Sequence, residues 1–169
     1  MGDPSVFAEY PSQRVVVRRP FLSDIEDLAA NLRYDDRREL EAHGCDAETG
    51  ILESLKVSTR AFVVEQCGKP VLIFGVSTTS QDGEAKTGGI WLLATTRIKG
   101  IARLFVRHSK EWMAEMAQGY DLLWNQVDAR NKLHHRWLQW CGCVFLREVK
   151  IGPHPFYEFV YKPCAQRPL

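Results

Sequence analysis

Residues 89–118 read GIWLLATTRIKGIARLFVRHSKEWMAEMAQ, and this stretch decides the fold. Its first part is a continuous apolar run that is typical of a buried strand. From Arg103 onward the apolar residues are spaced three and four apart, as on one face of a helix. A turn with a single glycine, Gly100, joins the two parts. The stretch therefore predicts a buried strand that leads directly into a long amphipathic helix.

This strand-to-helix turn has the chemistry of an anion site. The first amides of a helix lack partners within the helix, and the helix dipole is positive at that end. Gly100 has no Cβ to keep a ligand away from the backbone, and Arg97, Lys99 and Arg103 add positive charge. A pyrophosphate would fit there. The same residues could instead form an ordinary connection with solvated basic side chains, or a former phosphate site that no longer binds.

The rest of the chain predicts a mixed sheet with helices on both sides. Strands are expected at 14–18, 61–67, 71–77, 89–95, 121–128, 144–151 and 156–161, and helices at 23–32, 34–43, 46–59, 100–118 and 131–141. The polar segment 81–88 is expected to be a loop. The strand–helix–strand unit around Gly100 should be right-handed and partly parallel. We expect residues 1–13 to form an N-terminal arm, 14–163 a single domain and 164–169 a C-terminal tail.

Length and composition narrow the class of protein. The chain has 169 residues and a formal net charge of +1, which suits one domain with one core and argues against a dedicated nucleic-acid binder. No apolar run approaches the roughly 20 residues that span a bilayer. Five cysteines without a secretory signal are expected to be reduced and to be buried small residues. Cys141-Gly-Cys143 has no second ligand pair, so we expect no metal site.

The order of elements resembles that of the GNAT family of N-acetyltransferases, and two stretches carry the resemblance. Residues 92–103, LLATTRIKGIAR, resemble the family's pyrophosphate motif, R/Q-x-x-G-x-G/A after the fourth strand. Residues 127–131, VDARN, and 137–143, WLQWCGC, are similar to the later segment in which Asn131 would open a helix that ends at Gly142. The resemblance covers about 14–161. It implies an α/β, GNAT-like acyl-CoA N-acyltransferase fold, with a mixed central sheet flanked by helices.

The resemblance also implies a small-molecule partner, acetyl-CoA or CoA. The residues that it implies for binding are Leu93, Ala94, Arg97, Lys99, Gly100, Ile101, Ala102 and Arg103 at the turn, and Asn131 beside the pantetheine arm. The acid and base residues depart from the family. Residues 89–96 lack the glutamate that many members carry on the fourth strand, and Leu138 stands where many have a tyrosine. The substitutes that remain are Glu65, Asp82, Glu84 and Asp128 as bases, and Tyr157, Tyr161, His134 and Ser109 as donors; each also has an ordinary structural explanation.

A narrower resemblance is to short GNAT-like proteins of T7-like tailed phages, which are described as internal virion proteins or acetyltransferases. It rests on segments such as 15–18, 91–95, 105–109 and 136–140. It implies the host cytoplasm or the phage virion as location, and virion proteins or a host protein as partners. Two functions therefore stay open. One is an acetyl-CoA-dependent N-acetyltransferase; the other is a non-catalytic virion or morphogenesis component, or a binder of a host protein, that uses the fold as a scaffold.

Overall fold

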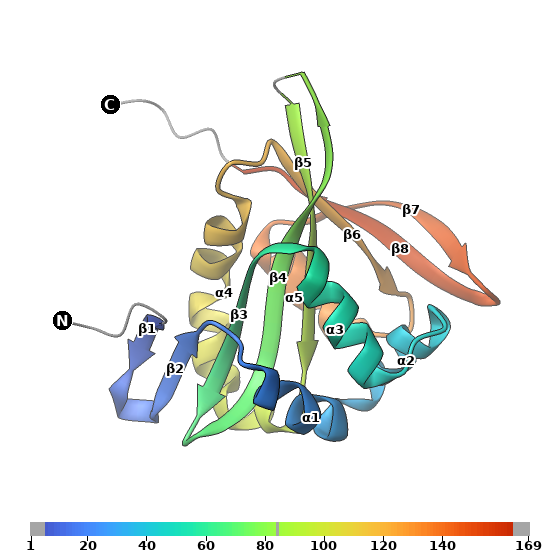
Figure 1. The fold of residues 1–169 in the computed structure, drawn as a ribbon. Coiled ribbons are helices and arrows are strands. Elements are labelled where there is room, and N and C mark those ends of the chain that lie inside the picture. Colours follow the sequence, from blue (N-terminus) through green and yellow to red (C-terminus); the bar gives the residue numbers. More distant parts are fainter. Residues whose placement is uncertain (1–5, 84, 164–169) are drawn as a thin grey trace, which may run out of the picture.

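The computed structural model describes residues 6–83 and 85–163. Its eight strands form one sheet in the order β1-β2-β3-β4-β5-β6-β8-β7 (Figure 1). The strands are β1 (Val6–Tyr10), β2 (Val15–Arg18), β3 (Ser58–Gln66), β4 (Lys69–Asp82), β5 (Ala85–Ala94), β6 (Leu122–Asp128), β7 (Val144–Ile151) and β8 (His154–Tyr161). The helices are α1 (Leu22–Asn31), α2 (Tyr34–Ala42), α3 (Ala47–Val57), α4 (Ala102–Ala117) and α5 (Lys132–Cys141), with short 3-10 helices η1 (Pro11–Gln13) and η2 (Thr96–Ile101).

Helices cover both faces of this sheet, and each group has its own apolar core. On one face, α1 and α3 bury Leu28 and Ile51 against Ile73 of β4. On the other face, α4 and α5 bury Met116 and Leu138 against the sheet. All five side chains are at most 1% exposed, and burying a side chain of this size stabilises a fold by about 1.5–3 kcal/mol. No helix in residues 6–83 and 85–163 is long and apolar enough to cross a membrane.

The predicted order of strands and helices is confirmed, with two differences. Residues 6–10, expected to lie in an arm, form β1, which pairs antiparallel with β2. Its alternate residues Val6, Ala8 and Tyr10 are half-buried, and this short alternation was too weak a signal to predict a strand. The loop expected at 81–88 is instead the tip of a β4–β5 hairpin, which is paired as far as Asp82 and Ala85. The expected tail at 164–169 lies outside the described residues.

The feature that positions the candidate site is a split between β5 and β6. These strands are parallel, and they pair for only three residues, Thr87–Gly89 with Leu122–Trp124. Both strands then continue separately, and Figure 1 shows them diverging below their crossing point. At the far end of β5, the connection from α1 to α2 closes over the strand, because the Arg33 amide donates to Ala94 O at 2.9 Å. The starts of α4 and α5 and helix α2 are thereby gathered around one opening.

Candidate functional site at the split between two strands

Two cavities meet at the split. The first, of about 270 Å³, lies between β5, β6 and helices α2, α3 and α5. The second, of about 180 Å³, lies between the end of β5, η2 and the first turns of α4 and α5. Leu92, His134 and Trp137 line both cavities. These three side chains therefore form a shared wall between two compartments.

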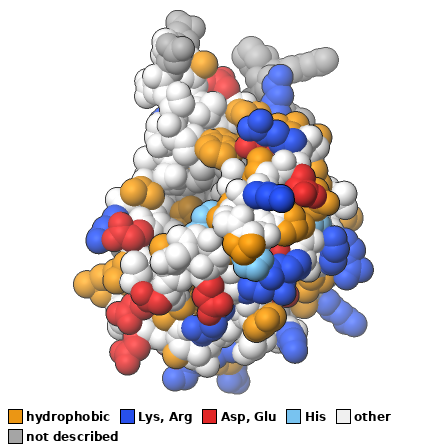
Figure 2. Space-filling view, turned by 90° about the vertical axis from the view of Figure 1, so that its right-hand side faces the viewer, with side chains coloured by type: hydrophobic (Ala, Val, Ile, Leu, Met, Phe, Trp, Pro, Cys, Tyr) orange, Lys and Arg blue, Asp and Glu red, His pale blue; other side chains and the backbone are white. Residues whose placement is uncertain are grey.

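The two cavities carry opposite charge. Among the described residues that line the first cavity, Glu39 and Glu53 are acidic and none is a lysine or arginine. Among those that line the second, Arg33 and Lys99 are basic and none is an aspartate or glutamate. We call the first the acidic cavity and the second the basic cavity. Figure 2 shows a hollow on this face, beside the column of the β4–β5 hairpin, with acidic side chains gathered to its lower left, on the side of α2 and α3.

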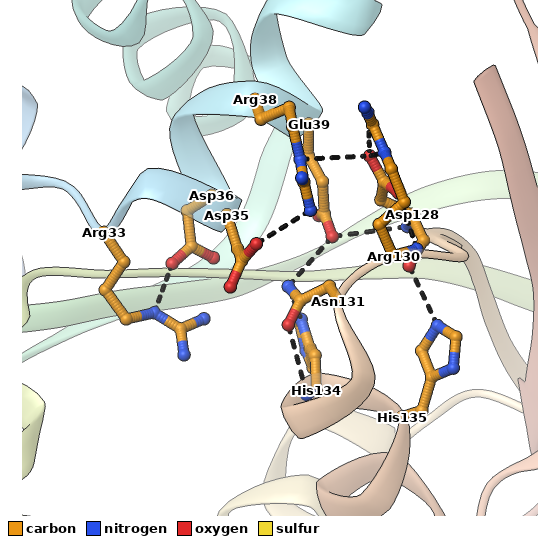
Figure 3. Close-up of polar contacts among 10 residues, drawn as sticks. All are labelled: Arg33, Asp35, Asp36, Arg38, Glu39, Asp128, Arg130, Asn131, His134 and His135. Atoms are coloured by element: carbon orange, nitrogen blue, oxygen red, sulfur yellow. Dashed lines mark hydrogen bonds and ion pairs between the residues drawn. The ribbon is translucent and has the colours of Figure 1, made fainter.

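Glu39 links α2 to the start of α5 at the edge of the acidic cavity (Figure 3). Its Oε1 accepts hydrogen bonds from the Asp128 amide at 3.2 Å and from Asn131 Nδ2 at 3.1 Å. Burial, with the negative charge of Asp36 beside it, raises the pKa of Glu39 to about 8. A carboxyl group with that pKa exchanges protons near neutral pH, which suits it to acid–base chemistry.

His134 lies in the shared wall and is held by Asn131. The Asn131 side chain caps α5 by accepting from the His134 amide at 3.2 Å, and its Nδ2 lies 3.5 Å from His134 Nδ1. Since Nδ2 can only donate, Nδ1 accepts and the ring proton resides on Nε2. Burial, together with the charge of Arg33, lowers the pKa of His134 to about 3. The ring is therefore a neutral donor at physiological pH.

The divergence leaves part of β5 without a neighbour. Residues of a strand direct their backbone groups alternately to the two sides, and Ile90 O and Ala94 O both bond on the β6 side. Leu92, which lies between them, must face the same side. No described residue donates to its carbonyl or accepts from its amide there. An amide-bearing chain in the cavities could pair with this edge as an added strand would.

No family model and no curated relative matches the sequence, whereas many solved structures match the fold. An acetyltransferase of the GNAT family from Streptococcus pneumoniae has a TM-score of 0.58 at 17% identity, over 89% of this chain and 99% of its own. The ribosomal-protein-S5-alanine acetyltransferase of Vibrio fischeri has a TM-score of 0.61 at 18% identity, over 96% and 99%. The spermidine N-acetyltransferase of Vibrio cholerae, in complex with CoA and spermine, has a TM-score of 0.60 at 12% identity, over 88% and 95%.

The chain has the GNAT fold. The fold class predicted from the sequence, a mixed sheet flanked by helices, is therefore confirmed. Identities below 20% establish the fold, and function has to be argued from the site itself.

The structure places the residues predicted to bind a cofactor in different surroundings. Leu93 lines the acidic cavity, and Lys99 and Ala102 line the basic cavity. Ala94 and Ile101 are buried in the core, Arg103 is exposed, and Asn131 is buried as the cap of α5. Their roles in binding stay predictions, and Lys99 and Ala102 are the two whose surroundings suit a ligand best.

Arg97 and Gly100 have structural partners in place of a ligand. The Arg97 guanidinium donates to the Asp27 carboxylate and to Pro70 O, and Arg97 does not line the basic cavity. A Cβ on Gly100 would lie 3.1 Å from Gln66 Oε1. Glycine there lets the turn pack closely against β3, which is a reason for glycine that needs no phosphate. Arg33 lines the basic cavity but is paired with the buried carboxylate of Asp36, so Lys99 supplies the positive charge next to the opening.

Three of the acid–base candidates named from the sequence, Glu65, Asp128 and Tyr157, line neither cavity. Glu65 accepts from Arg18 at 2.7 Å, and Tyr157 packs its ring against His135 and Phe145. Asp128 is fully buried; burial would raise its pKa, but hydrogen bonds from Arg130 outweigh that effect and hold it below its usual range. An acid held ionised in this way is a structural ion-pair partner, and these three are unsuited to proton transfer from where they lie.

The remaining candidates are placed as follows. Asp82 ends β4, Glu84 lies outside the described residues, and Ser109 donates to Val106 O within α4. Tyr161 lies at the end of β8. Of the donors considered, His134 is therefore the one that the structure brings to the wall between the cavities.

The cysteines are only partly as expected. Cys141 and Cys143 are buried, and burial raises the pKa of each thiol, to about 11 and about 12. Cys45 is half-buried and lines the acidic cavity, and Cys67 is exposed. The fifth, Cys164, lies outside the described residues. Both buried thiols are poor nucleophiles at neutral pH, so they serve as small core residues.

Proposed function

We propose that the protein is an acyl-CoA-dependent N-acyltransferase that transfers an acetyl group to a primary amine. The observation that carries this proposal is the pair of oppositely charged cavities that share Leu92, His134 and Trp137 as a wall. A transferase of this kind must bring an anionic thioester and a cationic amine to one point from two sides. The charges of the two compartments match those two reactants.

The basic cavity suits the thioester. Lys99 supplies positive charge at this cavity, whereas the guanidinium of Arg33 is already paired with the buried Asp36 carboxylate at 2.5 Å. The open edge of β5 at Leu92 offers amide and carbonyl groups to an extended, amide-bearing arm. Bound there, an acyl-CoA supplies an acyl carbon that an amine can attack, so that a C–N bond forms, the C–S bond breaks and one proton is released overall. The N-acetyltransferases of the same fold, including one whose structure contains CoA, support this assignment.

The acidic cavity suits the amine. The ionised form of Glu39 attracts an ammonium group, and Glu53, which also pairs with Lys56 at 2.6 Å, lies on the same lining. A volume of about 270 Å³ admits the amine-bearing end of an acceptor better than a whole large ligand. Glu39, with its pKa raised to about 8, takes a proton from the ammonium so that the nitrogen can attack. His134 lies where the two compartments meet and donates its Nε2 proton as a hydrogen bond to the carbonyl or the departing sulfur.

Acetyl-CoA binding and turnover test the proposal. The melting temperature should rise with acetyl-CoA, since a ligand at 100 times its Kd stabilises by about 2.7 kcal/mol. Free thiol should then appear only when a primary amine is added, in a panel of alkylamines, diamines and aminoglycosides. ATP at the same concentration is the control for a general affinity for nucleotides. An unchanged melting temperature at millimolar acetyl-CoA would remove the proposal.

The narrower sequence hypothesis adds biology without changing this chemistry. In the hypothesis drawn from the likeness to tailed-phage proteins, the enzyme works in the host cytoplasm or is carried in the virion, and its acceptor is an amine of a host or virion protein. We hold that location and those partners as proposals that rest on the sequence. Mass spectrometry of purified virions would test the location directly.

A further inference from the structure

The ladder between β5 and β6 ends abruptly, and neither strand explains why by its own backbone. A β-bulge commonly bends a strand away from its neighbour. Here β5 stays in register with β4 from Gly89 to Ala94, and β6 stays in register with β8 from Leu123 to Asp128. Both strands thus remain regular beyond the last pair. The register shift in β4 between Thr78 and Ser80 lies opposite Gly88 and Thr87, which still pair with β6, so it precedes the split. What keeps the strands apart beyond Gly89 therefore lies between them.

The side chain of Asn125 occupies the place of the next rung. Since Gly88 pairs with Leu123, a continued parallel ladder would set Ile90 opposite Asn125, and Ile90 O would accept from the Gln126 amide. In the structure, Ile90 O accepts from Asn125 Nδ2 at 2.6 Å. The Gln126 amide donates to Asn125 Oδ1 at 2.8 Å. The side-chain amide therefore stands between the two backbone groups and satisfies both.

The side chain at this place has to donate to Ile90 O and accept from the Gln126 amide, and an amide of this length does both. Each backbone group left without its partner in a half-buried place would be costly. A carboxylate at residue 125 could accept from the Gln126 amide but would oppose Ile90 O with a second oxygen, and an aliphatic side chain could bond with neither. At this one rung, the asparagine leaves Ile90 O and the Gln126 amide as well satisfied as a closed ladder would.

We propose that Asn125 is a positioning residue whose inserted side-chain amide holds β5 and β6 apart and keeps the edge of β5 at Leu92 free for an amide of the ligand. The identity of that ligand, an acyl-CoA with its amide-bearing arm, rests on the proposed function. The action of Asn125 on the two strands does not depend on it. Without Asn125 the ladder can extend by one rung, so that the Leu92 amide acquires a partner on β6.

Hydrogen exchange measured residue by residue in the ligand-free protein tests this directly. In the wild-type protein, the Leu92 amide should exchange at least 100-fold faster than those of Trp91 and Leu93, which face β4. In Asn125→Val, exchange at Leu92 should slow by at least 10-fold, and the affinity for acetyl-CoA should fall by at least 10-fold. Gln126→Val is the matched control for the exchange measurement, because it changes the next residue of the strand and leaves the inserted amide in place. Exchange at Leu92 should stay as in the wild-type protein; its affinity is not part of this control, since Gln126 lines the acidic cavity.

The outcomes separate this proposal from the proposed function. A slow Leu92 amide in the wild-type protein, or wild-type exchange and affinity in Asn125→Val, would overturn the role of Asn125. If exchange at Leu92 slows in the variant although the wild-type protein binds no acetyl-CoA, the role of Asn125 is supported and the proposed function fails. If the variant does not fold, the wild-type protein decides. Slow exchange of an Asn125 Nδ2 proton is then required, and fast exchange would contradict the inserted amide.

Discussion

The acidic cavity and the basic cavity are separated by three side chains, yet they are built from different parts of the chain. The basic cavity takes its charge from Lys99, in the turn that the sequence singles out, while Arg33 in its lining is paired with Asp36. The acidic cavity takes its charge from α2 and α3. These helices come before that turn in the sequence and are separated from it by strands β3, β4 and β5. The difference shows how the fold divides the work. The turn between β5 and α4 supplies the residue that attracts an anionic reactant. Helices α2 and α3 supply the residues that attract a cationic one.

Filling one cavity alone should have the largest effect. Ala102→Trp places a bulky ring in the basic cavity from an exposed residue of α4, and we expect the affinity for acetyl-CoA to fall at least 100-fold. Ala114→Trp is the matched control, since Ala114 is also exposed on α4 and lines neither cavity. Calorimetric titration measures both. Equal affinities in the two variants would show that the thioester does not use the basic cavity.

Removing the carboxyl group of the acidic cavity should act on turnover and spare binding. In Glu39→Gln we expect kcat to fall about 100-fold, as for loss of a general base, with the Kd for acetyl-CoA unchanged. The ionised form of Glu39 accepts the proton, so wild-type kcat/KM should rise with pH and level off above about 8.

The pH profile of Glu39→Gln should lack that rise. Deprotonation of the acceptor amine also makes kcat/KM rise with pH, around the pKa of that amine. The rise due to Glu39 is therefore the one whose pH does not change when acceptors of different pKa are compared. A rise near pH 8 that persists in the variant would assign the base to another group.

Reversing the charge of the basic cavity should have a smaller effect. In Lys99→Glu we expect the affinity for acetyl-CoA to fall about 10-fold, since a reversed charge at the rim of a solvated site changes binding by about 1.4 kcal/mol. The loss should shrink at high salt. Lys110→Glu makes the same change of charge on α4 at a lysine that packs over Trp140, away from both cavities. A loss of the same size in both variants would indicate a general effect of net charge.

The sequence could predict the strand-to-helix turn around Gly100, but it could not predict the acidic cavity. The change in the spacing of apolar residues across 89–118 predicts a buried strand followed by a helix, because this spacing depends on near neighbours alone. Lys99 and Ala102 follow from that local pattern. Glu39 does not, because it contacts Asn131 across 92 residues of sequence and belongs to a charged helix that resembles a solvated one.

Arg97 and Asn125 show the same limit of sequence-based prediction: the pattern assigns Arg97 a role at the phosphate site, and it gives no sign of the role of Asn125. Arg97 fits a phosphate motif by spacing, but a carboxylate 70 residues earlier in the sequence, on Asp27, takes its guanidinium. Asn125 reads as an ordinary strand residue, and its place in the ladder becomes visible only when Ile90 is set opposite it. Local periodicity therefore determines elements, whereas the partners of a polar side chain depend on which elements the fold brings together.

The most direct test of the two-cavity account is to map both reactants on the backbone amides by NMR. Acetyl-CoA should shift the amides of Leu92, Lys99 and Ala102 first, and an added diamine should shift those of Glu39 and Glu53, each reactant leaving the other set nearly unchanged until both are present. If acetyl-CoA instead perturbs the Glu39 side, or neither cavity responds at millimolar ligand, the assignment of an anionic reactant to one compartment and a cationic one to the other is contradicted.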